Sequence, residues 1–196
     1  MTRTHTTRTR TVPPGRVRII AGSLRGSRLA VPDVPGLRPT PDRVRETLFN
    51  WLQPLLPGAR CLDLYAGSGA LGIEALSRGA RSVCMVEREP ALVAALRANL
   101  ERLRQQAGTV VQAAALDYLA RAPQPFDVVF LDPPYAADAW SDTASALRSW
   151  LAPQARIYVE YPADAPAPRL PAHWQALRSA HAGAVGYALY QVDAQG

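Results

Sequence analysis

Through residues 60–161, short runs of apolar residues alternate with longer segments in which apolar residues recur every three or four positions. Short apolar runs indicate buried strands, and the longer segments between them repeat apolar residues at the helical spacing. The expected strands span residues 60–65, 82–86, 109–112, 127–131 and 156–161, and the expected helices span 70–78, 90–106, 115–121 and 140–151. Short strands separated by helices predict a mainly parallel sheet that is covered by helices on both faces.

The pattern changes after residue 161. A Pro- and Ala-rich loop leads to two more strand-like segments, residues 174–180 and 187–192, which are separated by a turn that contains Gly183 and Gly186. We predict that these segments form a hairpin and add an antiparallel strand to the sheet.

The segment before residue 60 is organised differently. Residues 17–21 and 28–31 are strand-like and are joined by a glycine-bearing turn, so they predict a small β-hairpin. Residues 40–52 predict a helix, with Thr40 as its N-cap and Pro41 in its first turn.

Basic charge is concentrated in this same part of the chain. Every one of the 22 basic residues is Arg, and residues 1–60 hold eleven of them against three acids, whereas residues 61–196 hold eleven against thirteen acids. This asymmetry indicates a polyanion-binding end. No apolar stretch approaches the roughly 20 residues of a membrane span, and the basic N-terminus lacks the apolar segment of a secretory signal. We therefore expect a cytoplasmic protein.

A glycine-rich loop follows the first strand of the alternating block. Asp63 belongs to that strand, and Gly67, Ser68, Gly69 and Gly72 follow it where a helix begins. Glycines let the backbone approach a ligand closely, and a helix N-terminus attracts negative groups.

Two acids support a nucleotide-type ligand at this loop. Asp63 lies four residues before Gly67, where it is placed to face the ammonium of an amino-acid ligand. Glu87 ends the next strand, twenty residues after Gly67, where it is placed to accept hydrogen bonds from both ribose hydroxyls. These features alone fit NAD and S-adenosylmethionine equally.

An Asp-Pro-Pro-aromatic run decides between the two ligands. Asp132, Pro133, Pro134 and Tyr135 directly follow the apolar strand at 127–131. The prolines stiffen the loop, so the Asp132 side chain and the Pro133 carbonyl can both accept from one NH₂ group, while Tyr135 offers a flat face to the base. An aryl amine attacks poorly because its lone pair is delocalised, and two fixed acceptors favour a pyramidal, reactive nitrogen. The run therefore predicts methylation of an exocyclic base amine, without a metal.

With these motifs the sequence resembles class I methyltransferases, and more narrowly the bacterial small-subunit ribosomal RNA guanine-N2 methyltransferase family called RsmD. The resemblance runs from about Arg16 to Val192. It is carried by residues 18–22 with 25–26, 38–52, 62–72 with 74–78, and 183–190. Residues 38–52 are the most specific of these, because generic methyltransferases lack that segment.

The resemblance implies a Rossmann-like α/β fold with a mostly parallel seven-stranded sheet, a C-terminal antiparallel hairpin and an N-terminal β-hairpin extension. It divides the chain into a disordered basic arm at 1–15, an RNA-binding hairpin at 16–37 and a methyltransferase domain at 38–196. The implied reaction moves a methyl group from S-adenosylmethionine to the N2 amino group of one guanine in 16S rRNA, within a partly assembled 30S subunit. The expected enzyme is a monomer.

The expected site residues fall into three groups. The catalytic group is Asp132, Pro133, Pro134 and Tyr135. The cofactor-binding group is Arg38, Thr40, Asp63, Gly67, Ser68, Gly69, Gly72, Glu87, Arg88, Ala114 and Ala115. The RNA-binding group is Arg16, Arg18, Arg25, Arg28, Arg43 and Arg45. Relatives commonly have Asp or Asn where this chain has Ala114, so backbone groups at Ala114 and Ala115, or the Asp117 side chain, are left to read the adenine.

Three other functions share parts of this pattern. An N6-adenine DNA methyltransferase uses the same Asp-Pro-Pro-Tyr chemistry, but such enzymes generally carry a sizeable target-recognition domain, for which this chain has no room. Protein glutamine methyltransferases usually have Asn in place of Asp132. An RNA-binding assembly factor without activity would not need the glycines, Glu87 and Asp132 together.

Overall fold

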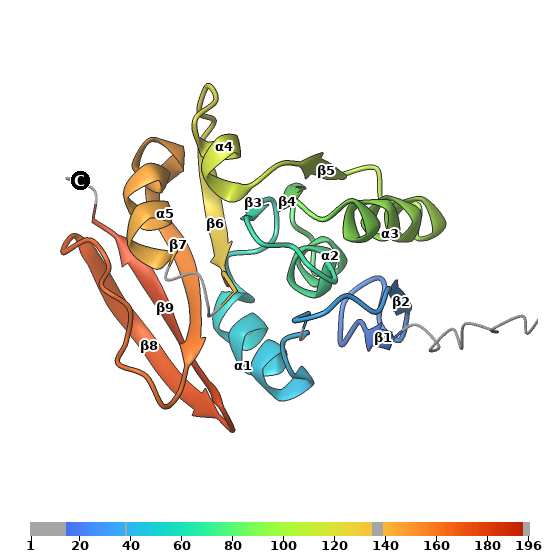
Figure 1. Cartoon of the computed structure of the whole chain (residues 1–196), viewed down its shortest axis with the longest axis horizontal. Helices are drawn as coiled ribbons and strands as arrows, with labels where there is room; N and C mark the ends of the chain where they lie inside the picture. The colour runs from blue at the N-terminus through green and yellow to red at the C-terminus, as the bar shows by residue number, and fades with distance from the viewer. Residues whose placement is uncertain (1–14, 38, 135–138, 194–196) are drawn as a thin grey trace, which may run out of the picture.

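Seven strands form one sheet in the computed structural model, which describes residues 15–37, 39–134 and 139–193. The strands are β3 (Arg60–Asp63), β4 (Ser82–Glu87), β5 (Gly108–Gln112), β6 (Phe126–Leu131), β7 (Leu151–Pro162), β8 (Trp174–Ala182) and β9 (Val185–Val192). Their order across the sheet is β5-β4-β3-β6-β7-β9-β8 (Figure 1). Strands β3 to β7 are parallel, and β9 runs antiparallel to both β7 and β8. The predicted parallel sheet and closing hairpin are confirmed.

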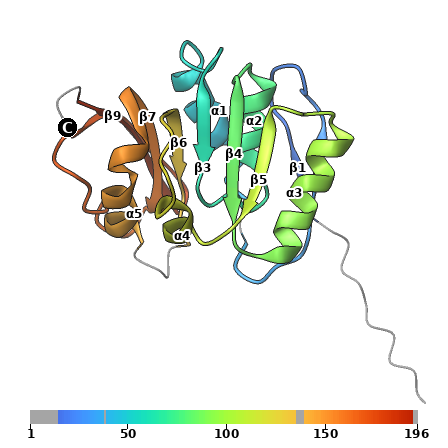
Figure 2. The same cartoon turned by 90° about the horizontal axis from the view of Figure 1, so that it is seen from above.

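Helices cover both faces of this sheet (Figure 2). One face carries α1 (Asp42–Leu52), α2 (Ala70–Ser77) and α3 (Pro90–Arg102), and the other carries α4 (Ala115–Leu119), α5 (Trp140–Ala146) and a 3₁₀ turn (Leu147–Trp150). Successive residues of a strand point to opposite faces. In β6, Phe130 accordingly packs in the cluster beside α1 and α2, and Val129 and Leu131 pack in the cluster beside α4 and α5.

Several predicted boundaries differ from the structure: the helix expected at 90–106 ends at Arg102, the strand expected at 156–161 begins at Leu151, and Gly186, expected in a turn, lies in β9. The helix expected at 140–151 ends at Ala146 and continues as the 3₁₀ turn, because β7 already begins at Leu151. Helix α1 begins at Asp42 with Pro41 as its N-cap and without a side-chain cap. Thr40 is therefore not the N-cap, because its side chain hydrogen-bonds with Asp132 instead.

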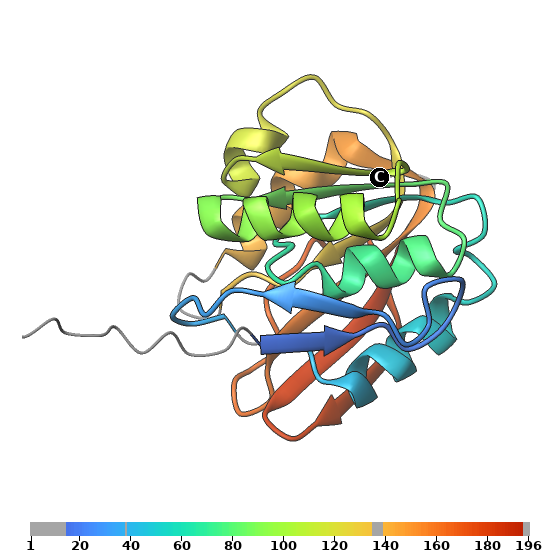
Figure 3. The same ribbon diagram turned by 90° about the vertical axis from the view of Figure 1, so that its right-hand side faces the viewer.

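The N-terminal segment forms a two-stranded antiparallel sheet of β1 (Gly15–Arg18) and β2 (Arg28–Val31). Val17 and Leu29 are opposite one another in the register and are both buried. They pack in the same hydrophobic cluster as α1 and α2. The hairpin therefore shares the core of the main sheet instead of building one of its own, and it lies alongside α2 and α3 (Figure 3).

Glu74 of α2 is completely buried, and its carboxylate holds the chain where it leaves β1. Oε2 accepts from the amide of Ile20 at 2.8 Å, and Oε1 accepts from the amide of Ala21 at 3.0 Å. The equally buried guanidinium of Arg45 lies 3.6 Å from Glu74 Oε2 and donates to Asp42 Oδ1 at 2.5 Å. Buried charges are tolerated when they are paired and hydrogen-bonded. This pair therefore fixes the hairpin against α1 and α2.

A second anchor lies at the end of α2. The Ser77 hydroxyl donates to the carbonyl of Ala21 and accepts from the amide of Leu24 at 2.9 Å, and the Ser77 carbonyl accepts from the amide of Ser23 at 2.8 Å. At Gly22, where φ is +82°, an added Cβ would lie 1.9 Å from the Ser77 carbonyl oxygen. Only glycine permits this approach of the hairpin to the helix.

The other strand of the hairpin is held by α3. The Asn99 side chain accepts from the amide of Ala30 at 3.1 Å and donates to the carbonyl of Ala30 at 2.9 Å. The Arg102 guanidinium donates to the carbonyl of Arg28 at 2.6 Å. Both strands of the hairpin are thus bound to the helical layer. Of the helices in the described ranges, none combines the length and apolar character that a membrane span requires.

The buried pair yields a stability prediction. Glu74→Gln should lower the free energy of unfolding by about 3 kcal/mol, because Arg45 then stays buried beside a neutral group. Amide exchange at Ile20 and Ala21 should also accelerate. Urea titration and hydrogen exchange measure the two effects. The matched change Glu46→Gln, on the exposed side of α1, should cost less than about 0.5 kcal/mol. Equal stability of the two variants would contradict the anchoring role.

Candidate active site

The predicted motifs meet at the carboxyl edge of the parallel strands. β3 ends at Asp63, β4 at Glu87 and β6 at Leu131, and the register pairs Asp63 with Met85 on one side and with Phe130 on the other. Carboxyl ends of neighbouring parallel strands form the usual ligand crevice of open α/β sheets. Motifs that are far apart in the sequence therefore reach one side of the molecule.

The glycine loop follows β3 and turns directly into α2. Gly69 is the N-cap of α2 with φ at +77°, and a Cβ there would lie 2.5 Å from Leu96 Cδ2. A Cβ on Gly72 would lie 2.9 Å from Met85 Cγ. Ser68 is buried, and its hydroxyl accepts from the Ala70 amide at 3.3 Å. The loop at Gly69 is therefore packed against α3, and the first turn of α2 at Gly72 is packed against β4.

Glu87 is clamped beside this loop. Its Oε2 accepts from the Gly67 amide at 2.9 Å, and its Oε1 accepts from the Glu89 amide at 2.9 Å. An ionised carboxylate has about four acceptor sites, so both oxygens retain capacity for further donors. Glu87 is half-buried and the next residue, Arg88, is exposed. A fixed, partly open carboxylate beside a glycine loop fits the two hydroxyls of a ribose.

Asp63 occupies a different place from the one expected. Only 2% of it is exposed, and its Oδ2 accepts from the Gly72 amide at 3.0 Å. Burial raises the pKa of Asp63 to about 7; the Gly72 amide opposes this rise, and the charge of Glu87 adds to it. A carboxyl sealed beneath the loop does not face a ligand ammonium. We therefore assign Asp63 to holding the first turn of α2.

Asp132 directly follows β6 and is half-buried. Burial raises the pKa of Asp132 well above its ordinary value, and the negative charges of Glu160 and Asp63 raise it further. A hydrogen bond with the Thr40 side chain, which is only 6% exposed, acts in the opposite direction. Thr40 thus joins the segment before α1 to the predicted catalytic strand. Pro133 is buried and Pro134 is exposed, so the chain emerges from the core at this point.

The segment after β5 lies on the other side of Glu87. The Ala113 amide donates to the Glu87 carbonyl at 3.1 Å, and Ala114 is the exposed N-cap of α4. Ala115 is buried, whereas Asp117 is exposed in the first turn of α4. The backbone at Ala114 is therefore accessible beside β4, the strand that ends at Glu87. The expected site residues Arg38 and Tyr135 lie outside the described residues, as does most of the predicted basic arm.

Three of the expected RNA-binding arginines share one face of the hairpin. Arg18 is opposite Arg28 in the β1–β2 register, and Arg16 is two residues away, so alternation places all three on the same face. All three are exposed, as are Arg25 in the connecting loop and Arg43 on α1. Arg18 lies 3.9 Å from Asp42, with both side chains more than half exposed.

Arg45 requires a correction. Its side chain is completely buried and is paired with Asp42 and Glu74, so it does not reach the surface on which RNA would bind. Its role is to hold the hairpin, through Glu74 and through a 2.9 Å hydrogen bond to the Arg18 carbonyl.

The sequence did not reveal Glu160 and Tyr158, two further polar groups at this edge. Both lie in β7, and the Tyr158 hydroxyl donates to Glu160 Oε2 at 2.7 Å. The sequence did contain a sign of Glu160: it is a charged residue in a largely apolar run, and a charged residue in a central strand has to be buried. Within the described ranges, no group of three or more His, Cys, Asp or Glu residues is arranged to hold a metal ion.

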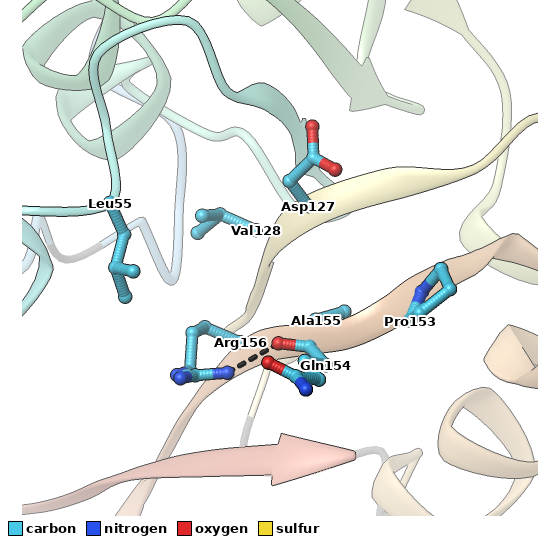
Figure 4. Close-up of a pocket in the computed structure, with 7 residues that line it drawn as sticks. All are labelled: Leu55, Asp127, Val128, Pro153, Gln154, Ala155 and Arg156. Atoms are coloured by element: carbon cyan, nitrogen blue, oxygen red, sulfur yellow. Dashed lines mark hydrogen bonds between the residues drawn. The ribbon is translucent and has the colours of Figure 1, made fainter. Parts of the chain in front are cut away.

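A surface pocket at the opposite end of the sheet contains none of the expected site residues. Its lining includes Leu55, Asp127, Gln154 and Arg156 (Figure 4). Asp127 lies at the amino end of β6 and accepts two hydrogen bonds, each 3.0 Å long, from the Arg60 guanidinium. The pocket lies at the amino ends of the parallel strands, and the glycine loop, Glu87 and Asp132 lie at their carboxyl ends.

Comparisons with known proteins show which families and structures the chain resembles. A family model described as "Conserved hypothetical protein 95" matches residues 17–191. Ribosomal RNA small subunit methyltransferase D of Escherichia coli K12 is 48% identical over 184 residues, which cover 93% of each chain. The protein with the same name in Haemophilus influenzae is 46% identical and covers 90% of this chain and 94% of its own.

Solved structures show the same fold. The Escherichia coli protein yhhF superposes with a TM-score of 0.86 at 45% identity, covering 92% of this chain and all of its own. An RNA methyltransferase from Salinibacter ruber, in complex with S-adenosyl-L-homocysteine, has a TM-score of 0.61 at 16% identity and covers 80% of this chain and 94% of its own. The second likeness concerns the Rossmann-like fold alone.

The raised pKa of Asp63 predicts a pH-dependent stability. Because its pKa is 3.8 ordinarily and about 7 in the fold, the stability that Asp63 contributes is present below about pH 4 and is lost as pH rises to about 7. The full cost approaches about 4 kcal/mol. Relative to wild type, Asp63→Asn should therefore become more stable across this range. Urea titrations of both proteins at several pH values measure the difference, and a difference that does not change with pH would refute the assignment.

Proposed function

This chain belongs to the family described as conserved hypothetical protein 95, and we propose that it methylates the N2 amino group of a guanine in 16S rRNA. More broadly, it is an S-adenosylmethionine-dependent methyltransferase of ribosomal RNA. The observation that carries the proposal is the place of Asp132: it follows β6, is hydrogen-bonded to Thr40 and lies on the same sheet edge as the glycine loop and Glu87.

The crevice residues fit S-adenosylmethionine. We assign the ribose hydroxyls to the spare acceptor sites of Glu87 and the amino-acid portion to the backbone of the loop at Gly67 and Gly69. The adenine is assigned to the backbone at Ala114 and Ala115. The Asp117 side chain is exposed in the first turn of α4, where an acid is favourable, so it is not assigned to the adenine. S-adenosylmethionine supplies an electrophilic methyl group on a positively charged sulfur, which is a good leaving group.

Asp132 and the Pro133 carbonyl are the proposed acceptors for the two N–H groups of the guanine amine. Hydrogen bonds to both N–H groups favour a pyramidal nitrogen and stabilise the positive charge that develops on it. The prolines fix these acceptors, because they restrict the backbone and remove two amide donors. Holding the amine nitrogen in line with the methyl carbon and the sulfur supplies much of the remaining rate enhancement. The proton that the nitrogen then loses is acidic, so no strong base is needed.

The RNA is proposed to lie over the exposed face of the hairpin. Arg16, Arg18 and Arg28 point outward together, and Arg25 and Arg43 add charge beside them. Arginines on one face suit a phosphate backbone, which positions a nucleic acid without reading its sequence. The proposed substrate is 16S rRNA within a partly assembled 30S subunit, and the proposed enzyme acts as a monomer.

Removing the acceptor tests the reaction. Asp132→Ala should lower the rate of methyl transfer at least about 100-fold while S-adenosylmethionine binding stays within about threefold of wild type. Small subunits that lack the methyl group serve as substrate, and mass mapping of the rRNA nucleosides identifies the product. Asp142→Ala, on the exposed side of α5, is the matched control and should retain the wild-type rate. Methylation of duplex DNA or of protein, but not of rRNA, would refute the proposal.

The hairpin face should also determine the salt dependence of binding. Replacing Arg16, Arg18 and Arg28 together by Ala should reduce the slope of log affinity against log salt by about 0.7 to 0.9 for each phosphate contact that is lost. Filter binding of 16S rRNA across a salt series measures the slope. Replacing Arg148, Arg169 and Arg178, which are exposed elsewhere, removes the same charge and should leave the slope nearly unchanged. The same slope change in both triple variants would exclude a specific role for the hairpin.

A further inference from the structure

Glu160 is a buried acid beside the proposed catalytic residue. It lies in β7 and is 5% exposed. β6 and β7 are parallel neighbours, and their register pairs Phe130 with Tyr158 and Leu131 with Val159. Asp132 and Glu160 each follow these pairs by one residue. Two carboxyl groups from adjacent strands are thus brought to the same end and the same face of the sheet.

The surroundings of Glu160 hold it in place. The Tyr158 hydroxyl donates to Glu160 Oε2 at 2.7 Å, and the indole Nε1 of Trp140 donates to the Glu160 carbonyl at 2.9 Å. On the neighbouring strand β9, the residue opposite Glu160 is Tyr187, which is buried. Side chain and backbone of Glu160 are both fixed, on the strand that neighbours the one that leads into Asp132.

We propose that Glu160 is a positioning residue for methyl transfer, and that its carboxylate controls whether Asp132 holds a proton. This inference rests on the proposed function, in which Asp132 accepts a hydrogen bond from the amine of the base. An ionised Asp132 is acceptor-only, whereas a protonated Asp132 presents an O–H donor toward an N–H donor. Glu160 therefore sets the pH above which the site is competent.

Electrostatics support this role. Two carboxylates that share a buried site disfavour each other's ionisation. The groups that act on Asp132 come from three directions: Glu160 on β7, Asp63 on β3 and the Thr40 hydroxyl before α1. The two acids favour the protonated form of Asp132, and Thr40 favours the ionised form. The proton that leaves Asp132 passes to solvent, since Asp132 is half-buried and the chain beyond it is exposed at Pro134.

The test is the pH dependence of kcat/KM for methylation of small subunits, which reports the ionisation of the free enzyme. Glu160→Gln keeps the size of the side chain and an acceptor for Tyr158, but removes the charge. The acid limb of the profile should move to lower pH by about one unit or more. Tyr158→Phe, which withdraws the donor that favours ionised Glu160, should move the limb in the same direction by less.

Two further variants separate electrostatics from a loosened site. Thr40→Val removes the donor to Asp132, so it should move the acid limb to higher pH, opposite to Glu160→Gln. Asp127→Asn removes one charge at the other end of β6, beside Arg60, and should leave the limb in place. Shifts of the same sign in all four variants would overturn the proposal, because a structural disturbance has no reason to reverse sign.

A measurement without substrate or cofactor keeps this inference distinct from the proposed function. The carboxyl carbon of Asp132, followed by NMR in the full-length protein, should titrate at lower pH in Glu160→Gln than in wild type. If it titrates unchanged, the coupling to Glu160 is wrong even when rRNA is methylated. If it shifts as expected but no substrate is methylated, the coupling stands and the proposed function fails.

Discussion

The completely buried carboxylate of Glu74 is the interaction on which the arrangement of the molecule depends. Helix α2 begins at the glycine loop and ends at Ser77, and every residue from Ala70 to Ser77 is buried. Glu74 and Ser77 hydrogen-bond to the N-terminal hairpin, while Gly69 and Gly72 allow the start of the helix to pack closely against Leu96 and Met85. One short helix therefore connects the basic hairpin rigidly to the glycine loop, where we propose that S-adenosylmethionine binds. A charge without its partners at this point would loosen both.

Carboxyl groups at one edge of the sheet have distinct tasks because their surroundings differ. Glu87 is fixed by two amides yet remains partly open, which suits binding of hydroxyl groups. Asp63 is sealed under the loop and holds the start of a helix. Asp132 stands between the acids Asp63 and Glu160 and the hydroxyl of Thr40, which act on its proton in opposite directions. The same functional group thus has a structural role at Asp63 and proposed binding and catalytic roles at Glu87 and Asp132, three residues that are far apart in the sequence.

Periodicity predicted the strands, the helices and their alternation, because the central strands are buried on both faces and therefore form short continuous apolar runs between helical segments. The glycine loop and the Asp-Pro-Pro run were located in the sequence because their chemistry is local. What sequence reasoning missed depends on partners that are distant in the chain. Arg45 was expected on the surface because arginines are rarely buried, and its burial is made favourable by the carboxylates of Asp42 and Glu74. Thr40 has the form of an N-cap, yet its partner is Asp132.

The Asn99 side chain hydrogen-bonds with both backbone groups of Ala30 in the N-terminal β1–β2 hairpin, and this pairing affects whether the hairpin can bind other strands. A two-stranded ribbon presents open N–H and C=O groups along its margins, and such margins recruit strands from other molecules. An amide side chain that satisfies both groups of one residue imitates a neighbouring peptide. The backbone of Ala30 is therefore not available for strand addition by another molecule, and the exposed arginines beside it are displayed on a ribbon whose margin is covered at that residue.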